Sequence, residues 1–210
     1  SLAVKTNGTL WAWGYNAFGQ LGLGDNLNRV SLSQVGTSSN WSSVEASNNY
    51  SMGLRTDGTL WAWGNNGDGQ LGQGDNNERL SPTQVGTDSD WEEFAVGQFS
   101  SAAIKSDGTL WAWGGNSDGQ LGQGDLVDHL APIQVGSNTN WLDLTMGRSF
   151  VIALADVGDP VDPVDPVDPV DTTASTATTV NSLPSTTTNS VNNVSYSRVN
   201  PVSAQPSFAG

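Results

Sequence analysis

The chain has 210 residues, a formal net charge of −14 at pH 7, nine tryptophans and no cysteine. An acidic chain repels the phosphates of nucleic acids and of anionic lipids, so neither nucleic acid binding nor membrane insertion is expected. Without cysteine the chain can form no disulfide framework and no thiolate zinc site, and no apolar run approaches the roughly 18 residues of a membrane span.

The first predicted element is a hairpin that occurs three times. The heptapeptide Gly-Thr-Leu-Trp-Ala-Trp-Gly stands at residues 8–14, 58–64 and 108–114, each time 50 residues after the previous copy. Each copy begins at an Asn-Gly or Asp-Gly pair, which favours a two-residue type I′ turn. Apolar residues alternate on both sides of that pair, as β-strands require. Residues 1–5 align with residues 51–55, so the sequence is expected to begin inside a strand and to be a fragment of a larger protein.

The rest of each 50-residue unit follows the same order. A segment Asn-x-x-Gly-Gln-Leu-Gly-x-Gly-Asp comes after the hairpin, at residues 16–25, 66–75 and 116–125. A variable loop, a short strand that ends in Gln-Val-Gly, a polar turn and a tryptophan-led strand complete the unit. Four short strands per 50 residues are typical of one propeller blade. Residues 1–156 are therefore predicted to be all-β, with about three blades of four antiparallel strands that form a partial propeller.

This motif resembles the regulator of chromosome condensation repeat family in its bacterial form. The resemblance covers about residues 1–156 and implies a β-propeller, usually of seven four-stranded blades. The family often has a histidine after a glycine of the inner strand, whereas this chain has Tyr50, Ser100 and Phe150 at those positions. Partner contacts that depend on the family's histidine are therefore not transferred to this chain.

The composition changes near residue 157. Four Asp-Pro-Val units run from Asp159 to Asp171. Each proline fixes its own φ and disfavours helix at the residue before it, so residues 157–171 are predicted to form an extended polyproline II spacer. Residues 172–210 are rich in serine and threonine and carry a single charge, Arg198. This composition predicts a disordered linker, with a further domain expected beyond it.

Residues that are identical in all three units, or that serve the shared hairpin turn as Asp57 does, are predicted to serve the fold. Packing against a neighbouring blade is a need that every unit shares, whereas a carbohydrate-stacking role for the tryptophans is the alternative. The predicted structural residues are Trp11, Trp13, Trp61, Trp63, Trp111, Trp113, Gly64, Gly72, Gly74, Asp57 and Gly58.

No catalytic residue, metal site or cofactor is predicted. His129 is the only histidine, which excludes a histidine-based triad and a zinc site of several histidines. The acidic loop residues could bind calcium, but they lack the ligand spacing of an EF-hand, and turn formation explains them more simply. Four acids between residues 88 and 93 could pair for acid–base chemistry, but they fit a solvated surface turn better.

Binding is predicted at the positions where the three units disagree. Loops on a rigid scaffold commonly carry recognition, and neutral drift in exposed loops is the alternative. The predicted binding residues are Tyr15, Phe18, Asn28, Arg29, Tyr50, Asp68, Glu78, Arg79, Phe99, Asp118, Asp128, His129 and Arg148.

The predicted function is a non-enzymatic protein–protein interaction module that belongs to a larger secreted or surface protein. A protein partner is expected, with a glycan as an alternative ligand. A guanine nucleotide exchange factor-like regulator of a small GTPase is the second candidate, as in the family's namesake, although these even units contain no insertion. An extracellular or cell-surface location is expected, with a cytoplasmic location as the alternative.

Overall fold

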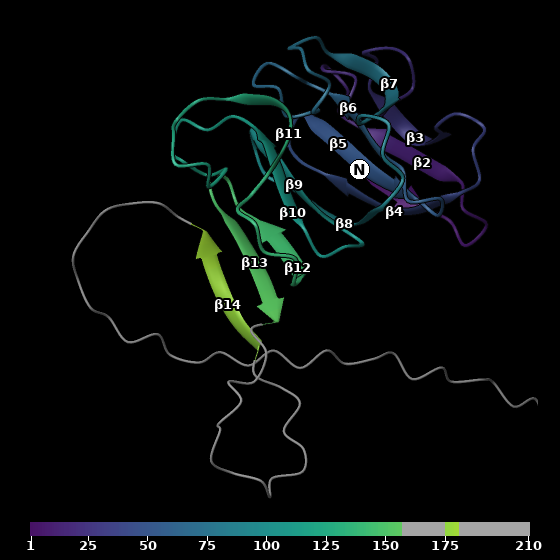
Figure 1. The fold of residues 1–210 in the computed structure, drawn as a ribbon. Coiled ribbons are helices and arrows are strands. Elements are labelled where there is room, and N and C mark those ends of the chain that lie inside the picture. Colours follow the sequence, from purple (N-terminus) through teal and green to yellow (C-terminus); the bar gives the residue numbers. More distant parts are fainter. Residues whose placement is uncertain (157–174, 181–210) are drawn as a thin grey trace, which may run out of the picture.

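The structure is a computed structural model that describes residues 1–156 and the strand at residues 175–180 (Figure 1). All regular elements of the described residues are β-strands, as the sequence predicts. The predicted Asp-Pro-Val spacer at residues 157–171 and the remainder of the predicted linker lie outside the described residues. No helix with the length and apolarity of a membrane span occurs in the described part of the chain.

Within the described residues, fourteen strands form four antiparallel sheets that follow one another in chain order across the molecule (Figure 1). The first sheet consists of β1 (Leu2–Val4), β2 (Leu10–Gly14) and β3 (Arg29–Gln34). The second consists of β4 (Trp41–Ala46), β5 (Tyr50–Arg55), β6 (Leu60–Gly64) and β7 (Arg79–Gln84). The third consists of β8 (Trp91–Val96), β9 (Ser100–Lys105), β10 (Leu110–Gly114) and β11 (His129–Gln134). The fourth consists of β12 (Trp141–Met146), β13 (Val151–Asp156) and β14 (Ser175–Val180).

The sheets are offset from the sequence units. The second and third sheets each open with the tryptophan-led strand of one unit and continue with the hairpin and the Gln-Val-Gly strand of the next unit, whereas β1–β3 all come from the first unit. The strand β1 contacts β4, β8 contacts both β4 and β5, and β12 contacts both β8 and β9, so neighbouring sheets meet along their first two strands. This is the arrangement of propeller blades, in which adjacent sheets pack face to face around inner strands.

The hairpin turn differs from the predicted two-residue type I′ turn. Arg55 N–H donates to the carbonyl of Thr59, and Gly58 N–H donates to the carbonyl of Arg55, both at 3.0 Å. The loop therefore has three residues and ends at Gly58, whose φ is 77°. A Cβ at Gly58 would lie 2.2 Å from the carbonyl oxygen of Ser89, so both the backbone conformation and the close approach require glycine.

Side chains of the hairpin explain why the motif repeats. The Oδ1 of Asp57 accepts hydrogen bonds from the backbone N–H of Thr59 at 3.1 Å and from its hydroxyl at 2.6 Å. The same hydroxyl accepts the indole N–H of Trp61 at 2.8 Å. These bonds recur at Asp107, and Asn7 makes them in the first unit.

The hydrophobic core lies between adjacent sheets, and each part of it receives a tryptophan from the sheet that follows. Trp63 and Trp113 are completely buried, while Trp11, Trp13, Trp61 and Trp111 are half-buried. Trp63 of the second sheet packs with residues of the first, namely Leu10, Ala12, Leu21 and Val35. Trp113 of the third sheet packs with the equivalent residues of the second, namely Leu60, Ala62, Leu71 and Val85.

The strand β14 is a departure from the predicted linker. Its six residues pair with β13 in an uninterrupted antiparallel register, from Val151 opposite Val180 to Asp156 opposite Ser175. Threonine and valine favour extended backbone, and the edge of β13 offers unpaired hydrogen-bonding groups. The sequence Ser-Thr-Ala-Thr-Thr-Val thus has a pairing partner that its composition does not reveal.

Candidate interaction surface

The segment after each hairpin is a loop that one buried asparagine holds together. Asn16 is completely buried. Its Nδ2 donates to the carbonyl of Asp25 at 2.8 Å, and its Oδ1 accepts the N–H of Leu21 at 2.8 Å. Asn66 and Asn116 make the same bonds in the other two units. Each loop is therefore a fixed scaffold on which the variable residues stand.

In the first two units, an aspartate at the end of the loop binds an arginine four residues later. The Oδ2 of Asp25 lies 2.6 Å from the guanidinium of Arg29, and that of Asp75 lies 2.8 Å from the guanidinium of Arg79. The bond to Arg79 and the backbone N–H of Asn77 lower the pKa of Asp75 to about 2. The pKa of Asp25 is lowered by the equivalent bonds.

The third unit has His129 at the position of the two arginines. Its Nε2 is buried and lies 3.7 Å from the Oδ1 of Asp125, which is too long for a hydrogen bond. Two further predicted binding residues also serve their own loops. The Oδ1 of Asn28 accepts the backbone N–H of Asn16, and that of Asp128 accepts the N–H of Asn116, both at 2.8 Å.

The prediction that Tyr50 binds a partner is wrong. Tyr50 is completely buried, and its hydroxyl donates to the carbonyl of Ser100 at 2.7 Å and lies 3.0 Å from the hydroxyl oxygen of Ser101. Burial raises the pKa of the phenol. Tyr50 therefore joins the second sheet to the third and has no free surface for a partner.

The variable loops and the β4–β5, β8–β9 and β12–β13 turns lie at one end of the sheets, here called the loop end. Gln20 of the first loop donates its Nε2 to the carbonyl of Asn48 in the β4–β5 turn at 3.3 Å. The hydroxyl of Ser47 in that turn donates to the carbonyl of Gly97 in the next turn at 2.6 Å. The three groups of predicted binding residues, scattered along the sequence, therefore share the loop end.

Neighbouring loops meet closely at this end. A Cβ placed at Gly115 would lie 3.3 Å from the Cβ of Phe99 and 3.5 Å from that of Asp68. Burial raises the pKa of Asp68, and the charge of Asp128 in the following loop adds to this effect. Phe99, Phe18 and Asp68 are half-buried, whereas Glu78, Asp118 and Arg148 are exposed.

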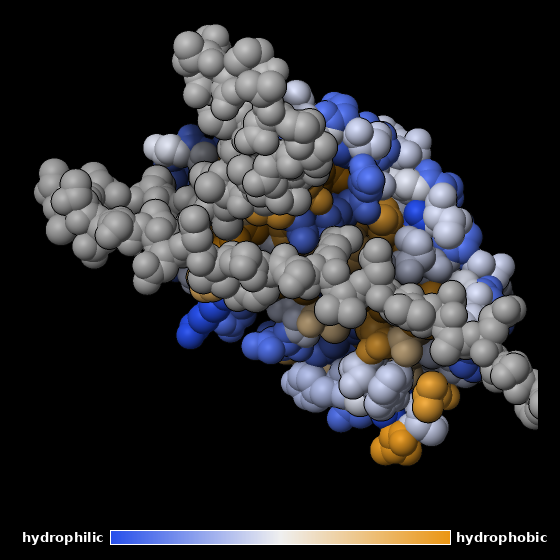
Figure 2. Space-filling model, turned by 90° about the horizontal axis from the view of Figure 1, so that it is seen from below, coloured by the Kyte–Doolittle hydropathy of each residue, from blue (hydrophilic) through white to orange (hydrophobic). Residues whose placement is uncertain are grey.

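Exposed apolar side chains complete the loop end. Tyr15 is 57% exposed, and it stands where the other units have Asn65 and Gly115. Leu27, Leu126 and Val127 are 61–67% exposed and are not among the predicted binding residues. A comparison of the units could have indicated them, because the second unit has the polar pair Asn76-Asn77 at the equivalent positions. Hydrophobic residues on the face that Figure 2 shows lie in separate patches among hydrophilic ones.

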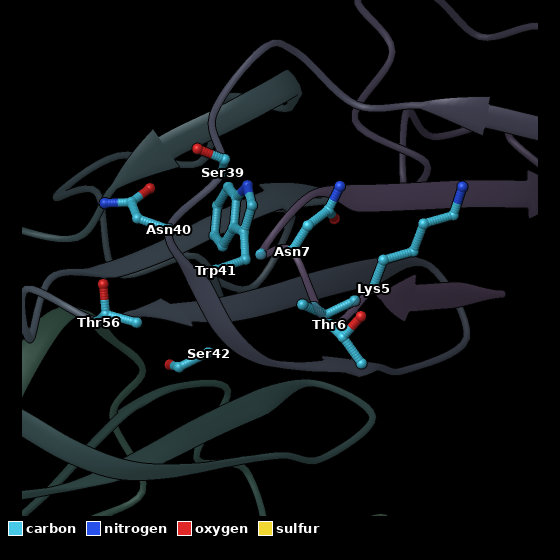
Figure 3. Close-up of a pocket in the computed structure, with 10 residues that line it drawn as sticks. Lys5, Thr6, Asn7, Ser39, Asn40, Trp41, Ser42 and Thr56 are labelled. Atoms are coloured by element: carbon cyan, nitrogen blue, oxygen red, sulfur yellow. The ribbon is translucent and has the colours of Figure 1, made fainter.

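A pocket of about 610 Å³ lies at the opposite end, by the hairpin turns (Figure 3). It is lined by residues 4–8 and 39–42 and by Thr56. Lys5 lies over the ring of Trp11 at 3.5 Å, whereas Arg55 lies over both Trp61 and Trp41. Among the described residues β1 pairs only with β2, so the pocket occupies the place that β4 takes beside β5. Its shape therefore follows from the sheet arrangement and does not indicate a ligand.

No group of three or more metal-ligating side chains occurs among the residues that the structure describes. Two of the four acids between residues 88 and 93 bind a lysine. The Nζ of Lys105 lies 2.7 Å from Asp88 and 3.2 Å from Asp90. Their ion pairs give these aspartates a structural role at the hairpin-turn end.

The antiparallel sheets of three and four strands, their face-to-face packing and the 50-residue offset units define a β-propeller repeat protein. The family model described as "Regulator of chromosome condensation (RCC1) repeat" matches residues 7–54, 57–104 and 107–154. A second model with the same description matches residues 41–70 and 92–120. The chain therefore belongs to the RCC1 repeat family.

Solved structures show the same fold. Prp20p from Saccharomyces cerevisiae is 21% identical with a TM-score of 0.66, and the match covers 72% of this chain and 40% of Prp20p. Human WBSCR16 is 24% identical with a TM-score of 0.64, and the match covers 73% of this chain and 42% of that protein. The chain thus spans about two fifths of the length of these relatives. Comparison with curated proteins gave no match.

Proposed function

We propose that this chain is a non-enzymatic protein interaction module that presents its loop end to a protein partner. The observation that carries the proposal is the gathering of the variable residues of all three units at one end. The buried asparagines hold each loop in the same conformation, so the loops differ mainly in the side chains they present. A rigid scaffold with variable side chains suits recognition, because little conformational entropy is lost on binding.

The chemistry of the loop end indicates the kind of partner. Exposed apolar side chains at Tyr15, Leu27 and Val127 stand among the acidic residues Glu78, Asp118 and Asp128. Protein interfaces commonly combine an apolar centre with a charged rim, and charge complementarity favours basic partners. We therefore expect a protein surface with an apolar patch and nearby lysine or arginine side chains.

Two structures of the relatives support a protein partner. Prp20p is described with its binding properties to Gsp1p and histones. A second structure, of Kap60 bound to yeast RCC1 (Prp20), matches 71% of this chain at 21% identity with a TM-score of 0.65. These partners belong to the relative, and for this chain they define the first proteins to test.

A guanine nucleotide exchange factor-like regulator of a small GTPase is the second candidate. Family membership and the fold that the chain shares with Prp20p support it. A glycan-binding module is the third candidate, and it rests only on the exposed polar and aromatic side chains of the loop end. The three candidates predict different ligands and can be separated with one set of probes.

The experiment uses the full chain, immobilised and exposed to arrays of small GTPases, histones and glycans. Binding of a protein probe without faster nucleotide release supports the first candidate, whereas faster release from a GTPase supports the second. Binding of glycans alone would overturn the first. For a protein that binds, residues 26–32 are replaced by residues 76–82, which keeps the arginine that binds the loop aspartate.

This loop exchange removes Leu27 from the surface and is expected to weaken binding at least tenfold while the melting temperature changes by less than about 2 °C. A matched control replaces residues 136–140 with residues 36–40 at the opposite end, which keeps Asn140. Equal affinity of both variants and the parent chain would place the interface away from the loop end.

A further inference from the structure

The third strand of the fourth sheet is not a tryptophan strand. In the second and third sheets, β5 and β9 pair with the tryptophan strands β6 and β10, so that Ser51 faces Trp63 and Ser101 faces Trp113. β13 is the equivalent of β5 and β9, but residues 157–164 do not repeat the tryptophan hairpin. β14 takes that place instead, with Val180 opposite Val151.

An apolar pocket lies beside this position. Its lining includes Leu110, Ala112, Leu121 and Val135 of the third unit, together with Val151 of β13. The equivalent residues of the first and second units enclose Trp63 and Trp113. The pocket is therefore the third copy of a site that receives an apolar residue from the third strand of the next sheet. In the register of β14, residue 180 stands opposite Val151, as Trp63 stands opposite Ser51 and Trp113 opposite Ser101.

The sequence of β13 differs from those of β5 and β9 at two positions. In β5 and β9 the side chains at these positions contact the tryptophan strand or its hydrogen-bond acceptor. The hydroxyls of Ser51 and Ser101 donate to the carbonyls of Gln20 and Gln70, which also accept the indole N–H groups of Trp63 and Trp113. Val151 replaces that serine and has no hydroxyl.

The second departure concerns the basic residue at the end of the strand. Arg55 lies 3.7 Å from the ring centroid of Trp61, and Lys105 lies 4.9 Å from that of Trp111. Ala155 replaces this cation in β13. The fourth sheet therefore lacks both the serine and the basic side chain that accompany a tryptophan strand in the other sheets. Val151, Ala153 and Ala155 of β13 are buried.

We propose that the outer edge of β13 and the adjacent pocket form a strand-binding site for the chain's own segment Ser175–Val180, which ends the repeat array in place of another tryptophan strand. Repeat arrays need an end unit that covers the last apolar face, and an uncovered strand edge promotes association. The site selects a strand with an apolar residue at the position opposite Val151.

The first test removes the pairing in the full chain. The double variant Ala177→Pro/Thr178→Pro deletes two successive N–H groups, and at least one of them belongs to the ladder because alternate residues donate to a neighbouring strand. The matched control is Thr186→Pro/Thr187→Pro in the same tail. Hydrogen exchange of the β13 amides that face β14 should become at least tenfold faster in the first variant and stay unchanged in the control. Unchanged exchange in both variants would overturn the proposal.

The second test uses the register. Val180→Trp supplies the residue type that the other two pockets hold, and the melting temperature should rise by about 2–6 °C. Thr179→Trp is the control, because successive residues of a strand point to opposite faces. Equal effects of the two tryptophans would contradict the assigned register. Protection of β13 that rises with protein concentration would show that the strand comes from a second copy, which would also overturn the proposal.

Discussion

The indole Nε1 of Trp63 donates a hydrogen bond to the backbone carbonyl of Gln20, 3.0 Å away and 43 residues earlier in the chain. Trp113 makes the same bond to Gln70, also at 3.0 Å. Each bond joins a strand of one sheet to the loop of the unit before it. The tryptophan hairpin, whose sequence is identical in the three units, therefore holds neighbouring sheets together rather than stabilising its own sheet alone.

Trp63→Ala should lower the free energy of unfolding by about 3–5 kcal/mol, because it removes a large, fully buried side chain between two sheets. Trp63→Phe should cost less, because it keeps most of the volume and the carbonyl of Gln20 retains the hydroxyl of Ser51 at 2.9 Å. Urea denaturation measures both. The exposed control Glu78→Ala should change stability by less than about 0.5 kcal/mol, and an equal cost for Glu78→Ala and Trp63→Ala would contradict the packing.

Tyr50→Phe should cost about 1–3 kcal/mol, because the carbonyl of Ser100 would lose a buried hydrogen-bond donor. Tyr15→Phe removes the same hydroxyl from a side chain that is 57% exposed, so stability should stay within about 0.5 kcal/mol of the parent chain. Thermal or urea denaturation distinguishes the two. Similar values for both variants would show that the Tyr50 hydroxyl does not connect the sheets.

Gly69→Ala and Gly74→Ala separate backbone strain from packing between sheets. Both glycines have a φ of 77°, so each substitution should cost about 1–2 kcal/mol of strain. A Cβ at Gly69 would also lie 2.5 Å from the Cδ2 of Leu130 and 2.9 Å from its Cα, whereas Gly74 has open space. Gly69→Ala should therefore cost about 1–3 kcal/mol more than Gly74→Ala. Equal denaturation midpoints would refute the close contact with the next sheet.

Asp75 should titrate near pH 2 in the folded chain, and Arg79→Gln should raise its pKa toward 3.8. A folded-state pKa below the ordinary value means that the ionised form stabilises the fold. That contribution is complete above pH 3.8 and is lost as the pH falls through about 2. The pH dependence of the side-chain carboxyl carbon shift measures the titration. Glu78→Gln is the control and should leave Asp75 near pH 2.

The repetition in the sequence accounts for most of what could be predicted of the fold. Three copies of one hairpin at a fixed spacing indicate stacked units, because no such unit can bury its apolar face alone. The turn type was predicted wrongly because Asp-Gly occurs in both two-residue and three-residue loops. The turn type depends on the hydroxyl of Thr59 and on the backbone of Ser89, which approaches Gly58 from the polar turn between β7 and β8.

The interaction surface could be predicted only in part. The comparison of the three units locates the variable loops, but it treats every difference as free for recognition. Tyr50 differs from its equivalents because its hydroxyl bonds to Ser100 in the next sheet, and the units there are not identical. Arg29 binds the aspartate of its own loop, whereas His129 at the equivalent position lies too far from Asp125 for a hydrogen bond. Such contacts with other residues are not contained in a comparison of aligned positions.

The offset between units and sheets has a consequence for how such a gene can lengthen. Because each 50-residue stretch supplies strands to two successive sheets, a tandem duplication of one stretch would recreate the same junctions on both sides, including the Trp63-type bond to the preceding loop. A gain or loss of any other length would set a tryptophan-led strand beside the wrong hairpin. Recombination between copies would therefore add or remove whole 50-residue units. The strand β14 would still pair with the last unit, and its own contacts would not change.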